Sequence, residues 1–480
     1  MDVLLITTPF LPLNYSEVKS LPLNRQERTS ISPPLGVCYL SSYLKERGYR
    51  VSILDLDVET FNLVKTKGTY TIHDIVYLIK DKGHFDVMGI SCLTSARYKK
   101  AHALAEIGKW LGMTTIMGGN YPTNSPKMAL DDKNVDYVVL GEGEETFYKL
   151  LRSIEEDAGL EEIDGVGYKN TIRNKKSFIQ DLDLLPYPDY ENLDIEKYYK
   201  VGMSQSWDGN NRFFTLITSR GCPNQCTYCV SHNTFGYKNR VRSVENVLKE
   251  VDWVKNKFGA NDILLQDDNF TKDKPRAKEI IDGLRLRGLK WSIPNGLEVN
   301  TIDRDFLEKV KASGCVDLTL AIESGSPKTL KMIKKSVDLN HAKEVINIMR
   351  ELGIYSKVFF MIGFPGETKE DIQQTIDYAS NLKPDWSLFS IVNPLPGSEI
   401  GKENPVFEDM GYANANISTK DFTAEDIQKI VYDANIKINF LENPNISRNP
   451  QLAKRDFKRI LDRYPEHTIA RRAFENLYYC

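Results

Sequence analysis

Three cysteines near the middle of the chain have the spacing with the clearest chemical meaning. Cys222, Cys226 and Cys229 form the pattern C-x3-C-x2-C. Cysteine thiolates hold iron–sulfur clusters, normally four to a cluster. Three thiolates can bind three irons of a four-iron cluster and leave the fourth iron open to a small chelating molecule. The spacing therefore indicates a reactive 4Fe-4S site rather than a simple electron carrier.

Two other arrangements of the same residues must be weighed. His232 lies three residues past Cys229, so the three cysteines and this histidine could form a tetrahedral zinc site in a zinc-stapled binding module. A disulfide with a spare thiol is disfavoured, because seven cysteines in 480 residues without an apolar signal segment do not suggest a secreted scaffold. Metal analysis separates the first alternative from an iron–sulfur site.

Composition limits the surroundings in which this chemistry takes place. The formal net charge is only -3, so we expect no nucleic-acid partner and no attraction to a membrane surface. No apolar run approaches the roughly 20 residues needed to span a bilayer. Reduced thiols and an iron–sulfur motif fit a cytoplasmic protein in a low-oxygen environment.

The chain from residue 1 to about 155 alternates short apolar runs with helical patterns, which predicts an α/β domain with a doubly wound, parallel, Rossmann-like sheet. Ligands of such sheets bind beyond the carboxyl ends of the strands. The predicted strands are Val3–Thr7, Val51–Leu56, Asp86–Ser91, Thr115–Met117 and Val135–Leu140.

Small and polar residues follow three of these strands, and glycine there would let a bulky ligand approach the backbone. They are Ser91, Thr94, Ser95, Gly118, Gly119, Gly141 and Glu142.

Beyond the first domain we expect three further parts. Residues 156–212 form a connector with a small hairpin near 165–170. Residues 213–403 resume the alternation, and six strand–helix units predict a partial (β/α)6 TIM-like barrel, with its reactive end at the carboxyl ends of the strands. Residues 404–480 form a small helical extension.

Features suited to ligand binding occur where the predicted barrel strands end. A carboxylate such as Glu323 can accept two hydrogen bonds from neighbouring hydroxyls. The strand-end residues, in chain order, are Gln266, Asp267, Asp268, Glu323, Ser324, Gly363, Phe364 and Pro365.

The cysteine run, whose third cysteine follows the aromatic Tyr228, resembles the signature of the radical S-adenosylmethionine (SAM) enzymes. The domain before it resembles a cobalamin-binding domain, and together they resemble the cobalamin-dependent radical SAM family, including its C-methyltransferases. The resemblance implies three cofactors: a 4Fe-4S cluster, SAM and cobalamin.

The resemblance also implies roles for the residues above. The three cysteines hold the cluster, Tyr228 packs beside adenine, and Glu323 binds the ribose. Ser324 adjoins the methionyl part, the Gly363–Pro365 run provides an edge for adenine, and the 266–268 run lies where relatives bind the SAM amino group. The strand-end residues of the first domain then hold cobalamin.

The first domain departs from other cobalamin proteins in two ways. It has no Asp-x-His-x-x-Gly motif, so we expect no protein histidine on cobalt, and His73, His84 and His102 are interpreted as surface or helix residues. The second loop has Asn120-Tyr121 where family members often have Pro-His.

By this resemblance the protein cleaves SAM reductively to a 5'-deoxyadenosyl radical and methylates an unactivated carbon through methylcobalamin. Cyclisation or rearrangement without methyl transfer remains an alternative. A methylthiotransferase-like or RNA-modifying enzyme would need further clustered cysteines, whereas Cys38, Cys92, Cys315 and Cys480 are scattered. We expect a small-molecule or peptide substrate and an electron donor such as flavodoxin or ferredoxin, and no proton-transfer residue is identified.

Overall fold

The computed structural model describes residues 1–14, 31–201, 212–402, 405, 415–419 and 421–443. The chain divides into two compact units, which are treated separately below. The first unit comprises residues 1–223 and 230–268, and the second comprises residues 224–229 and 269–480.

The first unit contains a seven-stranded sheet of order β2-β1-β3-β4-β5-β6-β7. The first five strands of this order pair in parallel, whereas β5–β6 and β6–β7 pair antiparallel. The strands are β1 (Asp2–Thr7), β2 (Arg50–Leu54), β3 (Val87–Ser91), β4 (Thr114–Gly118), β5 (Tyr137–Val139), β6 (Val166–Tyr168) and β7 (Thr171–Ile172).

The prediction of a parallel, doubly wound sheet is confirmed for these five strands. The hairpin expected near 165–170 is present, but it belongs to the sheet and is not separate from it. Val139 pairs with Val166, and the N–H of Leu140 donates to the carbonyl oxygen of Gly165 at 2.8 Å. The hairpin thereby satisfies the backbone groups of β5, which would otherwise be an exposed strand edge.

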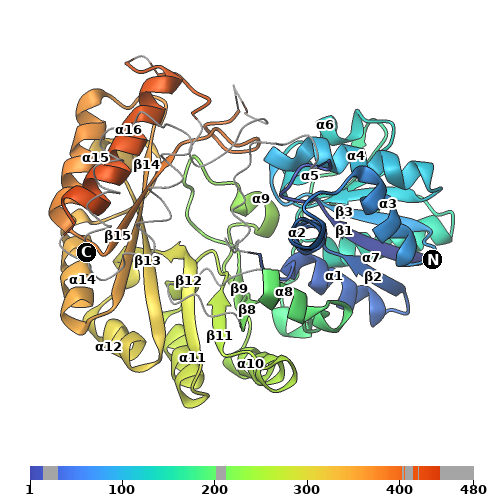
Figure 1. Ribbon diagram of the computed structural model, residues 1–480, viewed down its shortest axis with the longest axis horizontal. Coiled ribbons are helices and arrows are strands. Elements are labelled where there is room, and N and C mark those ends of the chain that lie inside the picture. Colours follow the sequence, from blue (N-terminus) through green and yellow to red (C-terminus); the bar gives the residue numbers. More distant parts are fainter. Residues whose placement is uncertain (15–30, 202–211, 403–404, 406–414, 420, 444–480) are drawn as a thin grey trace. The chain divides into compact units, whose positions relative to one another are not determined.

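Helices pack on both faces of this sheet (Figure 1). The apolar strands are buried as a result: Val3, Leu4 and Ile6 of β1 have no exposed surface. The helices are α1 (Leu35–Lys45), α2 (Leu56–Lys67), α3 (Ile72–Asp81), α4 (Tyr98–Trp110), α5 (Asn120–Asn124), α6 (Pro126–Leu130), α7 (Gly143–Glu155) and α8 (Ile195–Val201).

The strand order reverses direction at β1, which lies between β2 and β3. In sheets of order 2-1-3-4-5, this switch point marks the crevice where ligands bind, outside the carboxyl ends of the strands. β1 ends at Thr7 and β3 ends at Ser91, so the loops after these two strands border the expected site.

The first unit also contains the segments on either side of the cysteine motif. The parallel pair β8 (Phe213–Leu216) and β11 (Asp262–Leu265) and the antiparallel pair β9 (Ser219–Arg220) and β10 (Arg240–Val241) belong to it. Its remaining helices are α9 (Ser231–Phe235) and α10 (Val244–Phe258).

The second unit is built on four parallel strands of order β15-β14-β13-β12. These are β12 (Lys290–Leu297), β13 (Cys315–Glu323), β14 (Tyr355–Ile362) and β15 (Trp386–Ile391). The helices that alternate with them are α11 (Lys274–Leu286), α12 (Arg304–Ala312), α13 (Pro327–Met332), α14 (Leu339–Leu352) and α15 (Lys369–Leu382) (Figure 1).

Capping residues define one boundary each of helices α10 and α14. The hydroxyl of Ser243 accepts a hydrogen bond from the N–H of Asn246 and so caps α10. Gly353 ends α14 with φ +67°, a left-handed conformation that costs glycine little.

The helix α16 (Ala424–Ile436) covers the edge strand β15 of the second unit. The side-chain amide of Asn435 accepts from the N–H of Phe389 at 3.0 Å and donates to its carbonyl oxygen at 2.9 Å. Asn439 makes the same pair of bonds to Ser387, at 2.8 and 2.6 Å. These amides pair with the backbone as a further strand would, which protects the edge.

The expected helical extension thus exists in part, and residues 444–480 lie outside the described residues. Among the helices that the structure describes, none combines the length and apolar character that crossing a bilayer requires.

Candidate functional site

The cysteine motif begins at the end of β9 in a tightly folded loop. None of the six cysteines within the described residues forms a disulfide. Cys222 and Cys229 are half-buried and Cys226 is 8% exposed. Gly221 has φ +88°, and a Cβ there would lie 2.4 Å from the carbonyl oxygen of Lys238, so only glycine fits directly before the first cysteine. Within the described residues, no three Cys, His, Asp or Glu groups are gathered closely enough to hold a metal ion.

Two carboxylates at the end of β11 fix the start of this loop. Asp267 accepts hydrogen bonds from the N–H and hydroxyl of Thr218, at 2.7 and 2.6 Å, and from the hydroxyl of Ser219. Asp268 accepts from the N–H of Gly221 and the hydroxyl of Ser231, which lowers its pKa, but burial dominates and raises the pKa above its ordinary value. The two predicted ligand residues therefore have different surroundings.

The oxygen Oδ2 of Asp268 is buried and has no hydrogen-bond partner within the described residues. A buried carboxylate oxygen without a partner is costly, and it is a natural acceptor for an incoming cationic group. Gln266, the third residue of the predicted set, is half-buried, and its N–H donates to the carbonyl oxygen of Leu216.

In the second unit, Glu323 ends β13 next to Tyr228 of the cysteine motif. Glu323 is 7% exposed and accepts a hydrogen bond from the Tyr228 hydroxyl, and the ammonium group of Lys335 lies 3.8 Å away. Burial raises the pKa of Glu323, and Lys335 and Tyr228 lower it in part. Burial also raises the pKa of Tyr228, and the charge of Glu323 adds to the rise.

The backbone of Glu323 is strained. Its φ is +69°, which is uncommon for a residue with a side chain, and the β13–β14 register shifts between Ala321 and Glu323. Such conformations cost roughly 1–3 kcal/mol, and they are concentrated at functional sites. Here the irregular strand end directs the carboxylate toward Tyr228.

Ser324, in contrast, is held inside the protein. It is fully buried, its hydroxyl lies 2.9 Å from that of Thr375, and it accepts a hydrogen bond from the N–H of Ser326. The hydroxyl thus supports the turn after β13, and a contact between this residue and SAM stays a prediction.

The loop after β14 is closed by Glu367, which sequence reasoning did not single out. Its Oε2 accepts the N–H groups of Gly363 and Phe364 at 2.8 and 2.9 Å. Burial raises the pKa of Glu367 to about 7 despite these bonds. Phe364 is fully buried, with its ring centroid 5.7 Å from that of Tyr228. The predicted adenine edge is therefore a rigid turn packed against the aromatic residue of the cysteine motif, followed by Pro365.

A second residue missed from the sequence is Glu298, directly after β12. One of its oxygens accepts from the amide groups of Asn224 at 3.1 Å and Asn269 at 2.9 Å. Asn224 lies between the first two motif cysteines, so Glu298 fixes the middle of the motif. The signal available in the sequence was its position at a strand end.

The predicted cobalamin loops lie at the carboxyl ends of β3 and β4. The hydroxyl of Thr94 caps a short helical turn that contains Ser95, whereas Ser91 accepts the N–H of Thr8 through its carbonyl oxygen. Gly119 has φ +100°, and a Cβ there would lie 2.6 Å from the carbonyl oxygen of Cys92. At Gly118, the nearest atom to such a Cβ is 3.8 Å away, so this position is open to a ligand.

The third predicted loop is occupied by the protein itself. A Cβ on Gly141 would lie 3.0 Å from Lys175 and 3.3 Å from the carbonyl oxygen of Thr234. The carboxylate of Glu142 is buried against Arg220 and Arg240. Contacts of these residues with cobalamin remain a prediction, and the described contacts favour a different role for Glu142.

His102 lies in helix α4, as the prediction of a surface or helix residue allows, and it also makes specific contacts. Its ring nitrogens lie 2.7 Å from Asp132 and 2.9 Å from the hydroxyl of Tyr121. Tyr121 is fully buried in the loop after β4, so this histidine links helix α4 to that loop.

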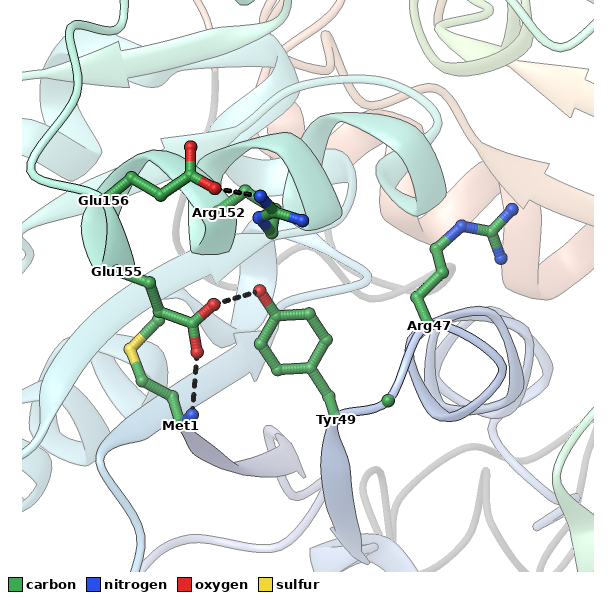
Figure 2. A pocket seen from close by; sticks show the side chains of 7 residues that line it. Met1, Arg47, Tyr49, Arg152, Glu155 and Glu156 are labelled. Atoms are coloured by element: carbon green, nitrogen blue, oxygen red, sulfur yellow. Dashed lines mark hydrogen bonds and ion pairs between the residues drawn. The ribbon is translucent and has the colours of Figure 1, made fainter.

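A polar hollow at the opposite edge of the first sheet does not belong to this site. Met1, Arg47, Tyr49, Arg152 and Glu155 are among the residues that line it (Figure 2). Glu155 accepts hydrogen bonds from the amino group of Met1 at 2.8 Å and the hydroxyl of Tyr49 at 2.7 Å. The hollow lies where β1 begins, whereas ligands bind parallel sheets where strands end.

Comparisons with known proteins match two regions of this chain, one in the first domain and one around the cysteine motif. Residues 23–151 match the B12 binding domain, and residues 216–379 match the radical SAM superfamily. An uncharacterized methyltransferase of Pyrococcus horikoshii is 32% identical over 84% of this chain and 87% of its own length. The chain belongs to the family of cobalamin-dependent radical SAM methyltransferases.

A second relative supports this membership, and a solved structure has the same fold. The cytidylyl-2-hydroxyethylphosphonate methyltransferase of Streptomyces wedmorensis is 31% identical over 80% of each chain. The radical SAM methyltransferase TsrM of Kitasatospora setae, solved with tryptophan and a SAM analogue, has 18% identity and a TM-score of 0.65 over 84% of this chain and 75% of TsrM. This likeness confirms the fold, a Rossmann-like domain with a partial barrel. Relatives at 25% identity or below include cyclases as well as methyltransferases.

Membership in the radical SAM family decides between an iron–sulfur cluster and a zinc ion at the cysteine motif. The protein is a 4Fe-4S, SAM and cobalamin enzyme, so the zinc-stapled module is excluded. By the chemistry of their donor groups, though not by a gathered arrangement of the three thiols, the described residues fit these groups at three places: the thiols of the motif, the unpartnered oxygen of Asp268 and the open backbone at Gly118. His232, the fourth ligand of the rejected zinc site, has its ring stacked on Tyr237 at 4.6 Å.

Proposed function

We propose that this enzyme transfers a methyl group from SAM to an unactivated carbon of a small molecule. The observation that carries the proposal is the uninterrupted similarity to methyltransferases across both the B12-binding and the radical SAM regions. Relatives named as cyclases match 75–77% of this chain at 24–25% identity, whereas these two methyltransferases match 80–84% of it at 31–32% identity.

The cofactors, when bound, supply one-electron cleavage of SAM and transfer of a methyl group through cobalt. The protein binds and orients them. In this proposal Cys222, Cys226 and Cys229 hold the iron–sulfur cluster. The Oδ2 atom of Asp268 accepts a hydrogen bond from the ammonium group of SAM. Glu323 accepts the ribose hydroxyls from its strained position, and Tyr228 keeps its carboxylate in place.

Cyclisation or rearrangement without methyl transfer is the second candidate, because more distant relatives are cyclases. The two candidates leave different products from SAM. Methylation of a C–H bond consumes two SAM molecules: one takes the hydrogen and leaves methionine and 5'-deoxyadenosine, and the other gives its methyl group and leaves S-adenosylhomocysteine. A reaction without methyl transfer forms no S-adenosylhomocysteine.

The methylthiotransferase alternative has less support. It requires a second cluster, whereas Cys38 and Cys92 are buried in the first unit and Cys315 begins β13 in the second. These three described cysteines do not form another motif.

The partners in this proposal follow from the chemistry. Two electrons per methylation must come from a donor, for which a flavodoxin or ferredoxin is suited, and we propose a cytoplasmic location. The net charge of -3 gives no reason to expect nucleic acid as substrate. The proposal keeps the division into cobalamin domain, connector, radical SAM core and extension.

The experiment is an anaerobic assay with methyl-labelled SAM, hydroxocobalamin and a chemical reductant, run against a panel of metabolites and peptides and analysed by mass spectrometry. We expect a labelled product together with equal amounts of S-adenosylhomocysteine and 5'-deoxyadenosine. A converted substrate that carries no label and leaves no S-adenosylhomocysteine would reject methyl transfer in favour of rearrangement.

A further inference from the structure

Four charged side chains are buried together in the first unit. Glu142 comes from the loop after β5, Glu144 from the first turn of α7, Arg220 from β9 and Arg240 from β10. Their side chains are only 1 to 6% exposed. Two negative and two positive charges balance within this cluster, which we call the 142/240 cluster.

The ion pairs in the 142/240 cluster have close geometry. Arg240 donates to both oxygens of Glu142, at 2.7 and 2.9 Å. Arg220 donates to Glu144 at 2.8 Å and to Glu142 at 3.3 Å. Burial alone would raise the pKa of Glu144, but the charge and hydrogen bond of Arg220 outweigh it, and the pKa lies below its ordinary value.

Stability alone is a weak reason for such a cluster. Taking charges out of water is expensive, and apolar residues of similar volume often give equal or greater stability. Ion pairs of fixed geometry do, however, define how two segments meet. The question is therefore which segments the 142/240 cluster joins.

The arginines belong to the backbone that carries the cysteine motif. Arg220 immediately precedes Gly221 and Cys222, and it pairs with Arg240 in the β9–β10 ladder. Arg240 also donates to the carbonyl oxygen of Phe235 at 2.8 Å, which holds the end of α9. The N–H of Cys222 donates to the carbonyl oxygen of Gly236 at 3.3 Å. These bonds leave the backbone at Cys222 little freedom.

The glutamates belong to the carboxyl edge of the cobalamin domain. Glu142 follows Gly141 in the loop after β5 and also accepts the N–H of Ile179 at 3.0 Å. Glu144 begins the first turn of α7. The 142/240 cluster thus connects the ligand edge of the first sheet to the residue before the first cysteine.

Independent contacts join the same two regions. In α5, directly after β4, the side chain of Asn120 accepts from the hydroxyl of Thr234 at 2.7 Å. Asn124 accepts from the amide of Asn233 at 2.7 Å. Thr234 and Asn233 lie in α9, which begins two residues after Cys229. Loops after both β4 and β5 therefore contact segments that flank the motif.

We propose that Glu142, Glu144, Arg220 and Arg240 are positioning residues, which set the distance between Cys222 with its iron–sulfur cluster and the cobalamin proposed at the loops after β3 and β4. This inference rests on the proposed function, because methyl transfer requires the two cofactors to act on one substrate. Glu142, predicted to contact cobalamin, is in this proposal a residue that acts through the arginines.

The test measures the separation of the two cofactors directly. Full-length holoenzyme, with its cluster reduced and its cobalamin in the Co(II) state, contains two unpaired spins, and pulsed electron paramagnetic resonance gives the distribution of distances between them. The variants are Glu142→Gln and Glu144→Gln, which keep the size of the side chain and remove one charge. Arg220→Lys keeps the charge and removes the two-nitrogen geometry.

The matched control is Glu250→Gln. Glu250 is a fully buried carboxylate in the same unit, paired with Arg242, whose side chain is 4% exposed, and it has no contact with the 142/240 cluster among the described interactions. Glu250→Gln should lower the melting temperature as Glu142→Gln and Glu144→Gln do, because each of these three substitutions removes the negative charge that pairs with an arginine.

We expect the wild type and Glu250→Gln to share one narrow distance distribution. Each of the three variants in the 142/240 cluster should retain iron and bind hydroxocobalamin within about threefold of wild type. Its distribution of distances between the two spins should be broadened or shifted. Wild-type distributions in all three variants would overturn the positioning role while leaving the proposed function intact. Loss of iron or cobalamin from all three would show that the residues serve binding or folding instead. A wild type that binds no cobalamin would contradict the proposed function itself.

Discussion

The hydroxyl of Tyr228 donates a hydrogen bond to the carboxylate of Glu323. This bond joins the cysteine motif to the end of β13. The tyrosine lies directly before Cys229, and its ring packs against Phe364. The carboxylate is therefore oriented by the motif itself. The strained backbone at Glu323 indicates that this orientation is maintained at a cost.

Replacing Glu323 with Ala should weaken SAM binding without removing the iron–sulfur cluster. A hydrogen bond to a charged group contributes about 1.5–3 kcal/mol, so the affinity for SAM should fall by roughly tenfold to a hundredfold. Equilibrium binding of SAM to the reconstituted variant measures this. Glu351→Ala, at an exposed pair with Arg304, serves as the control and should bind normally. Unchanged SAM affinity with a full cluster would show that Glu323 does not bind the ribose.

Changing Cys222, Cys226 and Cys229 together to Ala should remove iron and abolish formation of 5'-deoxyadenosine. Because the first sheet is built from other residues, hydroxocobalamin binding should persist. Cys315→Ala is the control, since this half-buried cysteine at the start of β13 lies outside the motif and its loss should leave the iron content unchanged. The assignment would not survive a triple variant that still cleaves SAM.

The stability of the second unit should depend on pH through Glu367. Its pKa in the folded protein is about 7 against an ordinary value of 4.5. Since the folded pKa is the higher one, the stabilising contribution is complete below about pH 4.5 and is lost as the pH rises through 7. The loss is about 3 kcal/mol, at about 1.4 kcal/mol per pKa unit.

The variant Glu367→Gln isolates this effect, because its amide oxygen can accept from Gly363 and Phe364 without carrying a charge. Its melting temperature should be less sensitive to pH than that of the wild type between pH 5 and 8, and higher than wild type at pH 8. Glu399→Gln, at an exposed pair with Lys334, should follow the wild type. Identical pH profiles for Glu367→Gln and wild type would contradict the raised pKa.

Substitution of Gly118 should weaken cobalamin binding directly, whereas substitution of Gly119 should act through the fold. A Cβ at Gly118 meets no atom closer than 3.8 Å, so Gly118→Val should leave the melting temperature within a few degrees and lower hydroxocobalamin affinity more than tenfold. At Gly119 the added carbon would collide with the carbonyl of Cys92, so a loss of binding there would reflect damage to the fold. Gly36→Val, in open space at the start of α1, is the control. Normal cobalamin affinity in Gly118→Val would move the ligand away from β4.

The sequence predicted best the features that depend on residues close together along the chain. The cysteine spacing and the alternation of strands and helices are local patterns, and each could be predicted. The sequence also placed Glu323 at the end of a strand, which the end of β13 confirms, and its role in binding SAM stays a prediction.

The remaining features depend on contacts between distant segments. Glu142 meets Arg220 and Arg240, 78 and 98 residues further along the chain, so its position in a cobalamin loop gave no sign of its buried ion pairs. Glu298 joins Asn224 and Asn269 from three separate segments. The sheet membership of the 165–170 hairpin likewise depends on an edge that only the folded sheet presents.

The most direct test of the central claim follows the methyl group of SAM in the complete enzyme. Anaerobic protein, reconstituted with iron, sulfide and hydroxocobalamin, is reduced and given SAM with a deuterated methyl group, and its bound cobalamin is then analysed by mass spectrometry. We predict that cobalamin and cluster are retained together on the chain, that the deuterated methyl group appears on the bound cobalamin, and that an equal amount of S-adenosylhomocysteine forms. Retention of the cluster with no bound cobalamin and no S-adenosylhomocysteine would contradict a cobalamin-dependent methyltransferase.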